Sequence, residues 1–593
     1  MSYRSHPSDT KSMPGGIPYI ISNEAAERFS FYGMKAALAI FLANYLGVLG
    51  GESMSETKAT AYVSFFNSAV YLTPLLGALL ADILWGKYNT IVRLSVVYCL
   101  GHLSLAFMGV GGIVQFWLLG GLGLIALGAG GIKPCVSAHV GDQFGKNNQH
   151  LLTKVFNIFY LSINFGAVIS NLSIPWILKW YGPHWAFGIP GVLMALATFA
   201  FWLGRNKFIH VPPHGEAFFD ELKSRDGLTA IGKLVPLFLF VAVFWCLFDQ
   251  TASSLVFQAE KMDRNVFGIE VLPSQIQAAN PFLILVLIPI FTWIIYPGVN
   301  KLVPLTPLRK IGMGLFLMTI SFSVISLAQE AIDRGETPSV WWQLLAYLIF
   351  TTAEILVSIV CLEFAYTQSP RKMKSFVMGI YLLSVFAGNA LTGVINLYIE
   401  IPSITLSEKS THHDGFDQKK GTEDDLSFAD DKIISPAQAT LAEAAAEIET
   451  YYDKEEALPT TEVGNGTLNQ LKDPWGNPLR YTLISNEKAR ISSDGPDQTH
   501  LTKWDLGIIL SAKKSKKEEE NTWLNREKQR QGKMSTGAKE DKDQTFKLDY
   551  YAGGQTKLEG AAYFWFFTKL MLATSLIFIP FACVYKTKTY MQQ

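Results

Sequence analysis

The chain has 593 residues, of which 49% are hydrophobic and only 17% are charged, and its formal net charge at pH 7 is zero. A soluble protein of this length carries more charge and longer polar stretches, so the composition indicates a membrane protein. The net charge identifies no charged partner such as nucleic acid, and the five cysteines show no spacing typical of a metal site.

Apolar runs of about 20 residues or more recur along the chain, and each is long enough to cross a bilayer as a helix. The polar residues 1–16 precede the first run and give no sign of a cleavable signal peptide. We expect about twelve spans, at residues 17–47, 58–84, 91–110, 113–139, 152–179, 185–204, 231–258, 276–296, 306–328, 340–368, 373–399 and 559–585.

Lysines and arginines are concentrated in the loops that share a side with the N-terminus, among them Lys87, Arg205 and Lys310. The short loops on the other side hold few basic residues, so the positive-inside rule places the N-terminus in the cytoplasm. With about twelve spans the C-terminus is cytoplasmic too. We expect a multi-pass protein of the plasma (inner) membrane.

Residues 400–558, called here the insert, are polar and separate the last two spans, so this topology places them outside. Residues 436–456 have the pattern of an amphipathic helix. Further on, "RYTLI" and "ARISS" are expected to pair as a hairpin across "SNEK". The charged run 512–545 is expected to be a flexible linker, and the insert to be a small α+β domain of unknown partner.

The first span opens with a line of polar side chains. Glu24, Glu27, Arg28, Tyr32 and Lys35 fall on one face of a helix, whereas the opposite face is small or apolar. The simpler alternative is a charged cluster beside the membrane, with the helix beginning only after Arg28. An ionisable side chain at membrane depth needs a partner or a water-filled cavity.

Other spans carry matching charges, which favours the cavity. Lys133 lies in the fourth apolar run, Asp249 in the seventh and Glu354 in the tenth. Acids and bases on separate helices neutralise one another only where those helices converge, as they do in transporter sites near the membrane midplane.

At these residues the chain resembles a family. "EAAERFSFYG" matches the E-x-x-E-R-F-x-x-Y-G signature of proton-dependent oligopeptide transporters of the major facilitator superfamily. Similar matches are "GALLADILWGKY", "GAGGIKPCVSAHVGDQF", "FNIFYLSINFGAVIS", "FWCLFDQTASS" and "EFAYTQSPRKMKS". The resemblance covers about 430 residues, all but the insert and the tail. Within the insert, about 436–510 resembles the C-terminal part of type II secretion pseudopilins, at "DPWGNP" and the hairpin after it.

The resemblance implies an all-α fold of two six-helix halves. The first half is 17–204, the cytoplasmic linker is 205–230, and the second half is 231–399 completed by a last helix in 559–593. It also implies a proton-coupled symporter that imports di- and tripeptides by alternating access. We therefore expect a transporter and not an enzyme, with the proton as coupling ion and no cofactor.

Residue roles follow from the same resemblance. Arg28 and Lys133 would hold the peptide carboxylate, and Glu354 would hold its amino group. Glu24 and Glu27 would carry the proton with Arg28, Lys133 and Glu354, and Lys35 and Asp249 would pair as an outer gate. The further residues expected to line the substrate site are Tyr32, Tyr160, Asn164, Trp245 and Asn280.

The chemistry of the residues agrees with this reading. A short peptide offers two fixed end charges and its amides, and Arg, Lys, Glu and Asn recognise those groups without reading side chains. Tyr160 and Asn164 lie four residues apart on one helix face, so their role could be helix packing instead of substrate contact. The same alternative applies to Trp245, as an aromatic side chain that packs in the core.

The chain departs from the family where many members have a second tyrosine, here Phe31, and a tryptophan in span eleven, here Tyr381. Where animal members have a histidine in span two, this chain has Ser64. Animal members place an extracellular domain after span nine, whereas the insert of this chain follows span eleven. Two alternatives remain: transport of another small solute such as nitrate, or a secretion-linked scaffold or sensor built around the insert.

Overall fold

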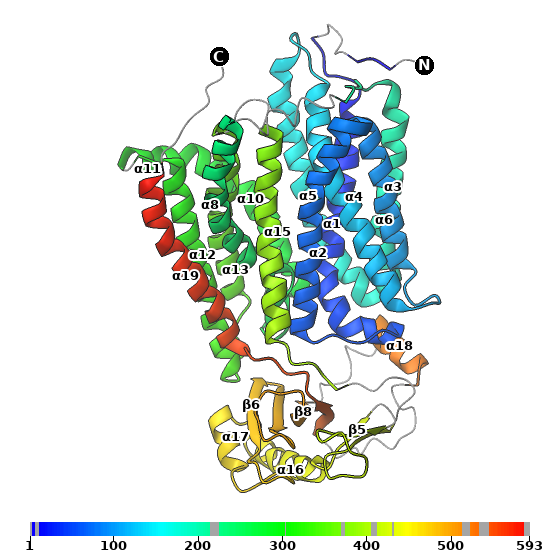
Figure 1. The fold of residues 1–593 in the computed structure, drawn as a ribbon, viewed down its shortest axis with the longest axis vertical. Coiled ribbons are helices and arrows are strands. Elements are labelled where there is room, and N and C mark those ends of the chain that lie inside the picture. Colours follow the sequence, from blue (N-terminus) through cyan, green and yellow to red (C-terminus); the bar gives the residue numbers. More distant parts are fainter. Residues whose placement is uncertain are drawn as a thin grey trace.

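A computed structural model describes residues 3–5, 11–213, 225–302, 304–368, 374–404, 412–429, 432–512, 522–532 and 545–585. Two bundles of long helices stand side by side, with both chain ends at one end of the molecule and the insert at the other (Figure 1). Part of the predicted linker 205–230, most of the charged run and the C-terminal tail lie outside the described residues.

Six helices form the N-terminal bundle. They are α1 (Ile17–Ile40), α2 (Glu56–Leu79), α3 (Lys87–Ala106), α4 (Val114–Asp142), α5 (Leu152–Tyr181) and α6 (Pro183–Leu203). A π-helical turn and a 3-10 turn extend α1 to Leu49, and a π-helical turn extends α2 to Trp85.

The C-terminal bundle is more interrupted. It contains α8 (Arg225–Phe248), α9 (Ser254–Glu260), α10 (Ala279–Ile290), α11 (Tyr296–Leu302), α12 (Pro307–Asp333), α13 (Trp341–Glu354), α14 (Val360–Thr367), α15 (Lys374–Ile399) and α19 (Gly560–Val584). A 3-10 turn, Asp249–Ala252, divides α8 from α9, and π-helical turns join α10 to α11 and α13 to α14. Counted as spans, these are six.

Eleven helical stretches of the described residues are long and apolar enough to cross a membrane. The predicted span 91–110 is the one without such a stretch among the described residues, and it corresponds to α3. This helix is less apolar because it begins at Lys87 and carries Arg93, yet it packs along α4 and α6. The predicted span 276–296 is too short: its helical stretch runs from Pro273 to Leu302. The other spans agree with the prediction to within a few residues, apart from α8, which begins at Arg225.

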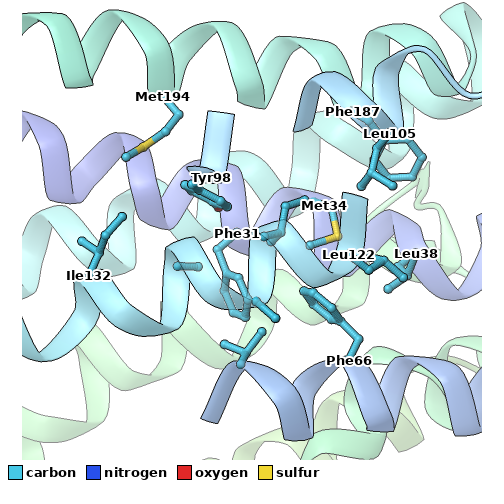
Figure 2. Close-up of a cluster of buried hydrophobic side chains, with 14 of the residues drawn as sticks. Phe31, Met34, Leu38, Phe66, Tyr98, Leu105, Leu122, Ile132, Phe187 and Met194 are labelled. Atoms are coloured by element: carbon cyan, nitrogen blue, oxygen red, sulfur yellow. The ribbon is translucent and has the colours of Figure 1, made fainter. Parts of the chain in front are cut away.

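Each bundle has its own apolar core. Figure 2 shows part of the N-terminal core, where Phe31 and Met34 of α1 meet Phe66 of α2 and Tyr98 of α3. Lipid is as apolar as these side chains, so close contact rather than escape from water holds the helices together. Glycines permit that contact: a Cβ on Gly77 of α2 would overlap the backbone of α4. The halves meet along α2 with α15 and α5 with α10.

The insert contains a four-stranded antiparallel sheet in the order β6 (Arg480–Ser485), β7 (Lys488–Ser493), β8 (Leu506–Ala512) and β9 (Phe546–Ala552). The helix α16 (Gln438–Glu455) packs on β7 and β8, and α17 (Thr461–Thr467) packs on β6. A smaller sheet joins β3 (His412–His413), β4 (Leu426–Ala429) and β5 (Lys432–Ile434), and β1 (Asn265–Val266) and β2 (Ile269–Glu270) form a hairpin after α9.

The insert differs from the prediction in two places. The hairpin is present, but its turn is shorter than predicted because Ser485 already pairs with Lys488. The prediction of a flexible linker at 512–545 is wrong for part of that range, because Trp523–Arg530 form helix α18 with Thr522 as its N-cap. The charged composition of this segment gave no indication of a helix. The helix is held in place by Trp523, which packs on the core of the N-terminal bundle.

Candidate functional site

The polar face of α1 is a buried cluster within the first candidate membrane span. Arg28 Nε donates a hydrogen bond of 2.7 Å to Glu24 Oε1, and the same nitrogen lies 3.3 Å from Glu27 Oε2. Glu24 and Glu27 are buried, whereas 14% of the Arg28 side chain stays accessible. The helix begins at Ile17, so the alternative of a charged cluster ahead of the span is wrong.

Glu27 is the least satisfied member of the cluster. Both of its carboxylate oxygens are buried and accept no hydrogen bond from the described residues, although Arg28 is close. A buried carboxylate without a hydrogen bond is costly, so this position suits a group that exchanges a proton.

Lys133 of α4 joins the cluster from a second helix. Its ammonium lies 3.8 Å from the ring centroid of Phe31 and 5.2 Å from that of Tyr71, both within cation–π range. It also interacts electrostatically with Glu27 and Arg28. Phe31 therefore serves as a platform for the lysine.

An acidic site lies in the C-terminal bundle. Glu354 is the last residue of α13, just before a π-helical turn, a distortion often found at functional sites. Asn280 of α10 donates from Nδ2 to Glu354 Oε2 at 2.8 Å and to Thr351 Oγ1 at 3.1 Å. Asn280 thus holds one carboxylate oxygen, and no described residue donates to the other oxygen of this half-buried side chain.

Tyrosines connect the basic cluster to the acidic one. Tyr32 interacts electrostatically with Arg28 on its own helix and with Glu354 in the other half, and Tyr160 of α5 also interacts with Glu354. The predicted cationic and anionic ends therefore lie in different halves, and the two tyrosines are within electrostatic range of the acid. A ligand with opposite charges at its two ends fits this arrangement.

Two predicted site residues are less clearly placed. Asn164 is only 7% exposed, and its amide donates to the Tyr160 carbonyl on the same helix, as expected for helix packing. Trp245 is 8% exposed and packs edge-on against Phe244 and Phe248 in the C-terminal core. Their substrate contacts stay a prediction.

The predicted gate pair is in contact. Lys35 Nζ lies 2.7 Å from Asp249 Oδ1, which joins α1 to the end of α8 across the two halves. The other carboxylate oxygen, Asp249 Oδ2, accepts a hydrogen bond of 2.8 Å from Asn389 of α15. A second cross-half pair, Lys261 with Glu56 at 3.1 Å, lies nearer the insert.

Sequence reasoning missed Asn389 and Thr351. A single asparagine in an apolar helix shows no partner in the sequence, and only the packing of α15 on α8 brings Asn389 to Asp249. Thr351 lies on the same helix as Glu354 and accepts a hydrogen bond from Asn280, which also donates to Glu354. Asn280 is bonded to Glu354 and orients that acid, a contact that the sequence did not indicate, and its predicted role in binding substrate stays a prediction.

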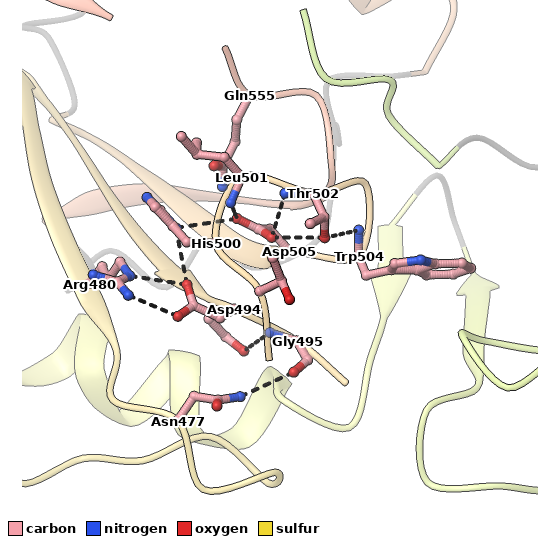
Figure 3. A network of polar contacts seen from close by, with 12 residues as sticks. Asn477, Arg480, Asp494, Gly495, His500, Leu501, Thr502, Trp504, Asp505 and Gln555 are labelled. Atoms are coloured by element: carbon pink, nitrogen blue, oxygen red, sulfur yellow. Dashed lines mark hydrogen bonds and ion pairs between the residues drawn. The ribbon is translucent and has the colours of Figure 1, made fainter. Parts of the chain in front are cut away.

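The insert carries a separate polar network (Figure 3). Ligand atoms of Asp494, His500 and Asp505 lie within 4.8 Å of one another. Arg480 binds both oxygens of Asp494, and Asp505 accepts the backbone N–H groups of Leu501 and Thr502. A metal ion there would have to displace these donors, so the network serves to close the loop between β7 and β8.

Comparisons with known proteins identify the family of the chain. A family model described as the POT family matches residues 88–226 and 221–411. "Peptide transporter family 1" of Drosophila melanogaster is 38% identical over 352 residues, which cover 52% of this chain and 47% of that protein. "Solute carrier family 15 member 2" of Mus musculus is 36% identical over 368 residues, covering 54% and 50%.

The chain thus spans about half the length of the curated relatives it matches. Among solved structures, the crystal structure of the POT family transporter PepTSo is similar with a TM-score of 0.60 and 36% identity. The match covers 66% of this chain and 91% of that one, so the shared fold includes both bundles.

Proposed function

The chain belongs to the POT family, and from that premise we propose that it imports di- and tripeptides together with protons by alternating access. The observation that carries the proposal is the pairing of a basic cluster in one half, Arg28 and Lys133, with an acid in the other, Glu354 held by Asn280. The names of the curated relatives, which include a peptide transporter, support it.

Peptide binding follows from the charges. The peptide carboxylate competes with Glu24 and Glu27 for Arg28, whose planar fork suits a carboxylate, while Lys133 supplies a second cation. The amino group binds the Glu354 oxygen that Asn280 leaves free. Because these contacts read only the two ends and the distance between them, they select by length and tolerate varied side chains.

Proton coupling follows from the exchange of partners at Arg28. When a peptide carboxylate takes the guanidinium, Glu27 loses its nearby cation inside an apolar bundle, and an acid in that position binds a proton more readily. Peptide and proton are then bound together. Release of the peptide inside returns Arg28 to Glu27 and frees the proton.

Alternating access is proposed from the gate. The contact of Lys35 with Asp249, which joins the two halves, supports a state closed on the side of the insert, the side that we propose faces outside. We place both termini in the cytoplasm and the insert outside the plasma membrane, in accord with the basic residues on the terminal side. An acid at the far end of the site, Glu354, disfavours nitrate as the cargo.

Purified protein in liposomes tests the proposal. Uptake of a labelled dipeptide should accelerate when the outside is made acidic and should collapse with a protonophore. Nitrate should not compete. Uptake that is indifferent to the pH gradient would contradict coupling, and absence of peptide uptake with nitrate uptake present would favour the other cargo.

A further inference from the structure

The outer gate contains a third residue, Asn389. Its side chain is fully buried on α15, and Nδ2 donates to Asp249 Oδ2 at 2.8 Å and to the Val385 carbonyl at 3.0 Å. Asp249 Oδ1 is taken by Lys35, so the two oxygens of this carboxylate have donors from two different helices, α1 and α15.

The preceding residue, Gly388, makes this contact possible. A Cβ at Gly388 would lie 2.8 Å from the Cys246 backbone nitrogen and would overlap the Ala242 carbonyl, so α15 and α8 touch backbone to backbone here. A short asparagine can therefore reach Asp249, one helical turn beyond Trp245. The Gly-Asn pair places an amide, rather than an apolar side chain, against the acid.

We propose that Asn389 is a positioning residue that stabilises the closed outer gate. Asp249 is 7% exposed while the gate is closed, and each oxygen of a buried carboxylate needs a donor. When the halves part on the outside, water enters and replaces the amide as donor. The hydrogen bond from Asn389 therefore stabilises the closed state more than the open one. This role rests on the alternating access of the proposed function.

A cysteine at Ser68 reports the opening of the gate without any transport measurement. Ser68 of α2 is 3% exposed, and its hydroxyl donates to the Phe386 carbonyl of α15 in the other half. In a background with the five native cysteines replaced, S68C in sealed vesicles with the insert side outward should react with an impermeant maleimide only when the halves separate outside. The reaction rate then scales with the open fraction.

N389A should raise the labelling rate by about tenfold, the effect of losing one hydrogen bond to a charged group. N396A is the matched control, because Asn396 is an equally buried asparagine of the same helix that bonds Thr392 and Tyr563 instead. The rate with N396A should stay unchanged. In a D249A background, N389A should have no further effect, since the acid through which it acts is gone.

An unchanged rate with N389A, or the same rise in the D249A background or with N396A, would overturn the proposal. The readout contains no peptide, so a failure here is distinct from a failure of the proposed function, which would appear in the uptake assay. D249A alone should raise the rate, which checks that the reporter senses this gate.

A second inference comes from helix α18. The body of the insert is anchored on the C-terminal bundle: Arg490 of β7 forms a paired contact of 2.5 and 2.6 Å with Glu559 ahead of α19, and Asn486 bonds Thr337 after α12. α18, in contrast, is docked on the N-terminal bundle beside the outer end of α5, where Figure 1 shows it apart from the sheet.

The contacts of α18 are specific. Trp523 stacks on Tyr45 with ring centroids 6.0 Å apart and covers Gly182, whose Cβ would lie 2.5 Å from the indole. Arg526 donates to the Trp180 carbonyl at 2.6 Å, and Gln531 donates to the Val48 carbonyl at 2.9 Å. One domain therefore contacts the outer ends of both halves.

We infer that α18 is a clasp that favours the state closed to the outside. Outward opening moves the outer ends of the bundles apart, and the insert is covalently continuous with the C-terminal bundle while α18 is bound to the other. Docking of α18 is therefore easier when the ends are together. By linkage, a helix that docks better in the closed state stabilises that state. This inference also rests on alternating access.

The S68C reporter tests the clasp. W523A removes the anchor and should raise the labelling rate several-fold. R530A changes an exposed side chain whose ion pair within the described residues is with Glu527 on the same helix, and it should leave the rate unchanged. Hydrogen exchange of 523–530 should show that W523A has released the helix. A released helix with an unchanged labelling rate would overturn the inference, as would an equal rise with R530A.

Discussion

Replacement of Glu354 by glutamine isolates the proposed contact with the peptide amino group. The volume of the side chain is kept and only the charge is lost. Asn280 Nδ2 donates to Glu354 Oε2 at 2.8 Å, so the new amide is oriented with its oxygen toward Asn280. Its NH₂ group then occupies the place of the free carboxylate oxygen and points a donor at the ammonium of the peptide.

The magnitude follows from the lost contact. A hydrogen bond to a charged group contributes about 1.5–3 kcal/mol, which corresponds to a decrease in affinity of about 10–150-fold. The fold should be little affected, because the bond to Asn280 is kept. E363Q is the matched control: Glu363 is an exposed acid nine residues further along the same helical span, and its loss should leave binding unchanged.

Competition binding with two peptides measures the effect. A free dipeptide should lose affinity in E354Q and keep it in E363Q, and thermal unfolding of both variants should match the wild type. An N-acetylated dipeptide, which lacks the ammonium, should bind the wild type and E354Q equally weakly. Equal competition by free and acetylated peptides in the wild type would refute the role of Glu354.

Three further predictions follow from particular contacts. E27Q should lose gradient-driven accumulation of peptide yet keep peptide counterflow, because a glutamine cannot release a proton but still fills the site beside Arg28. R28A should lose both activities. If E27Q still accumulates peptide, the proton site lies elsewhere. G495A should destabilise the insert by about 1–3 kcal/mol, because Gly495 has φ +66° and its Cβ would overlap the Trp504 carbonyl; hydrogen exchange of β7 and β8 should quicken, and unchanged protection would contradict this. Burial would raise the pKa of Asp494, but Arg480 and His500 together hold that pKa below its usual value. The Asp494 carboxylate therefore stabilises the insert above about pH 4, and this stabilisation is lost as the pH falls through the folded-state pKa. R480M should therefore weaken protection of β6 and β7 at pH 7 by about 1 kcal/mol or less, as Arg480 is 45% exposed, and should match the wild type in strong acid; an equal difference at every pH would exclude the charge pair as the cause.

The sequence was most informative where charges lie in apolar helices. Glu24, Arg28, Lys133, Asp249 and Glu354 each stand out because a charge at membrane depth needs a partner. The structure places Glu24 and Arg28 near Lys133, pairs Asp249 with Lys35, and bonds Glu354 to Asn280. Spacing along α1 was sufficient to place its residues on one face, since helical geometry fixes that relation. The partners across helices came from the resemblance and not from spacing.

Neutral residues were harder to place. The contact of Asn389 with Asp249 depends on the close approach of α15 to α8 at Gly388, which is a property of the packed bundle. Helix α18 was missed because its charged composition resembles that of a solvated linker and its stability comes from Trp523 docking elsewhere. The strand β9 was missed for a related reason, because its partner β8 lies before the charged run.

The most direct test of the account is whether peptide movement carries protons. Protein is reconstituted into liposomes that contain a pH-sensitive dye and have equal pH on both sides, with the membrane potential clamped at zero. Addition of a dipeptide outside should acidify the lumen, and the signal should be absent with E27Q and with empty liposomes. Peptide entry without acidification would contradict the proposed coupling through Glu27 and Arg28.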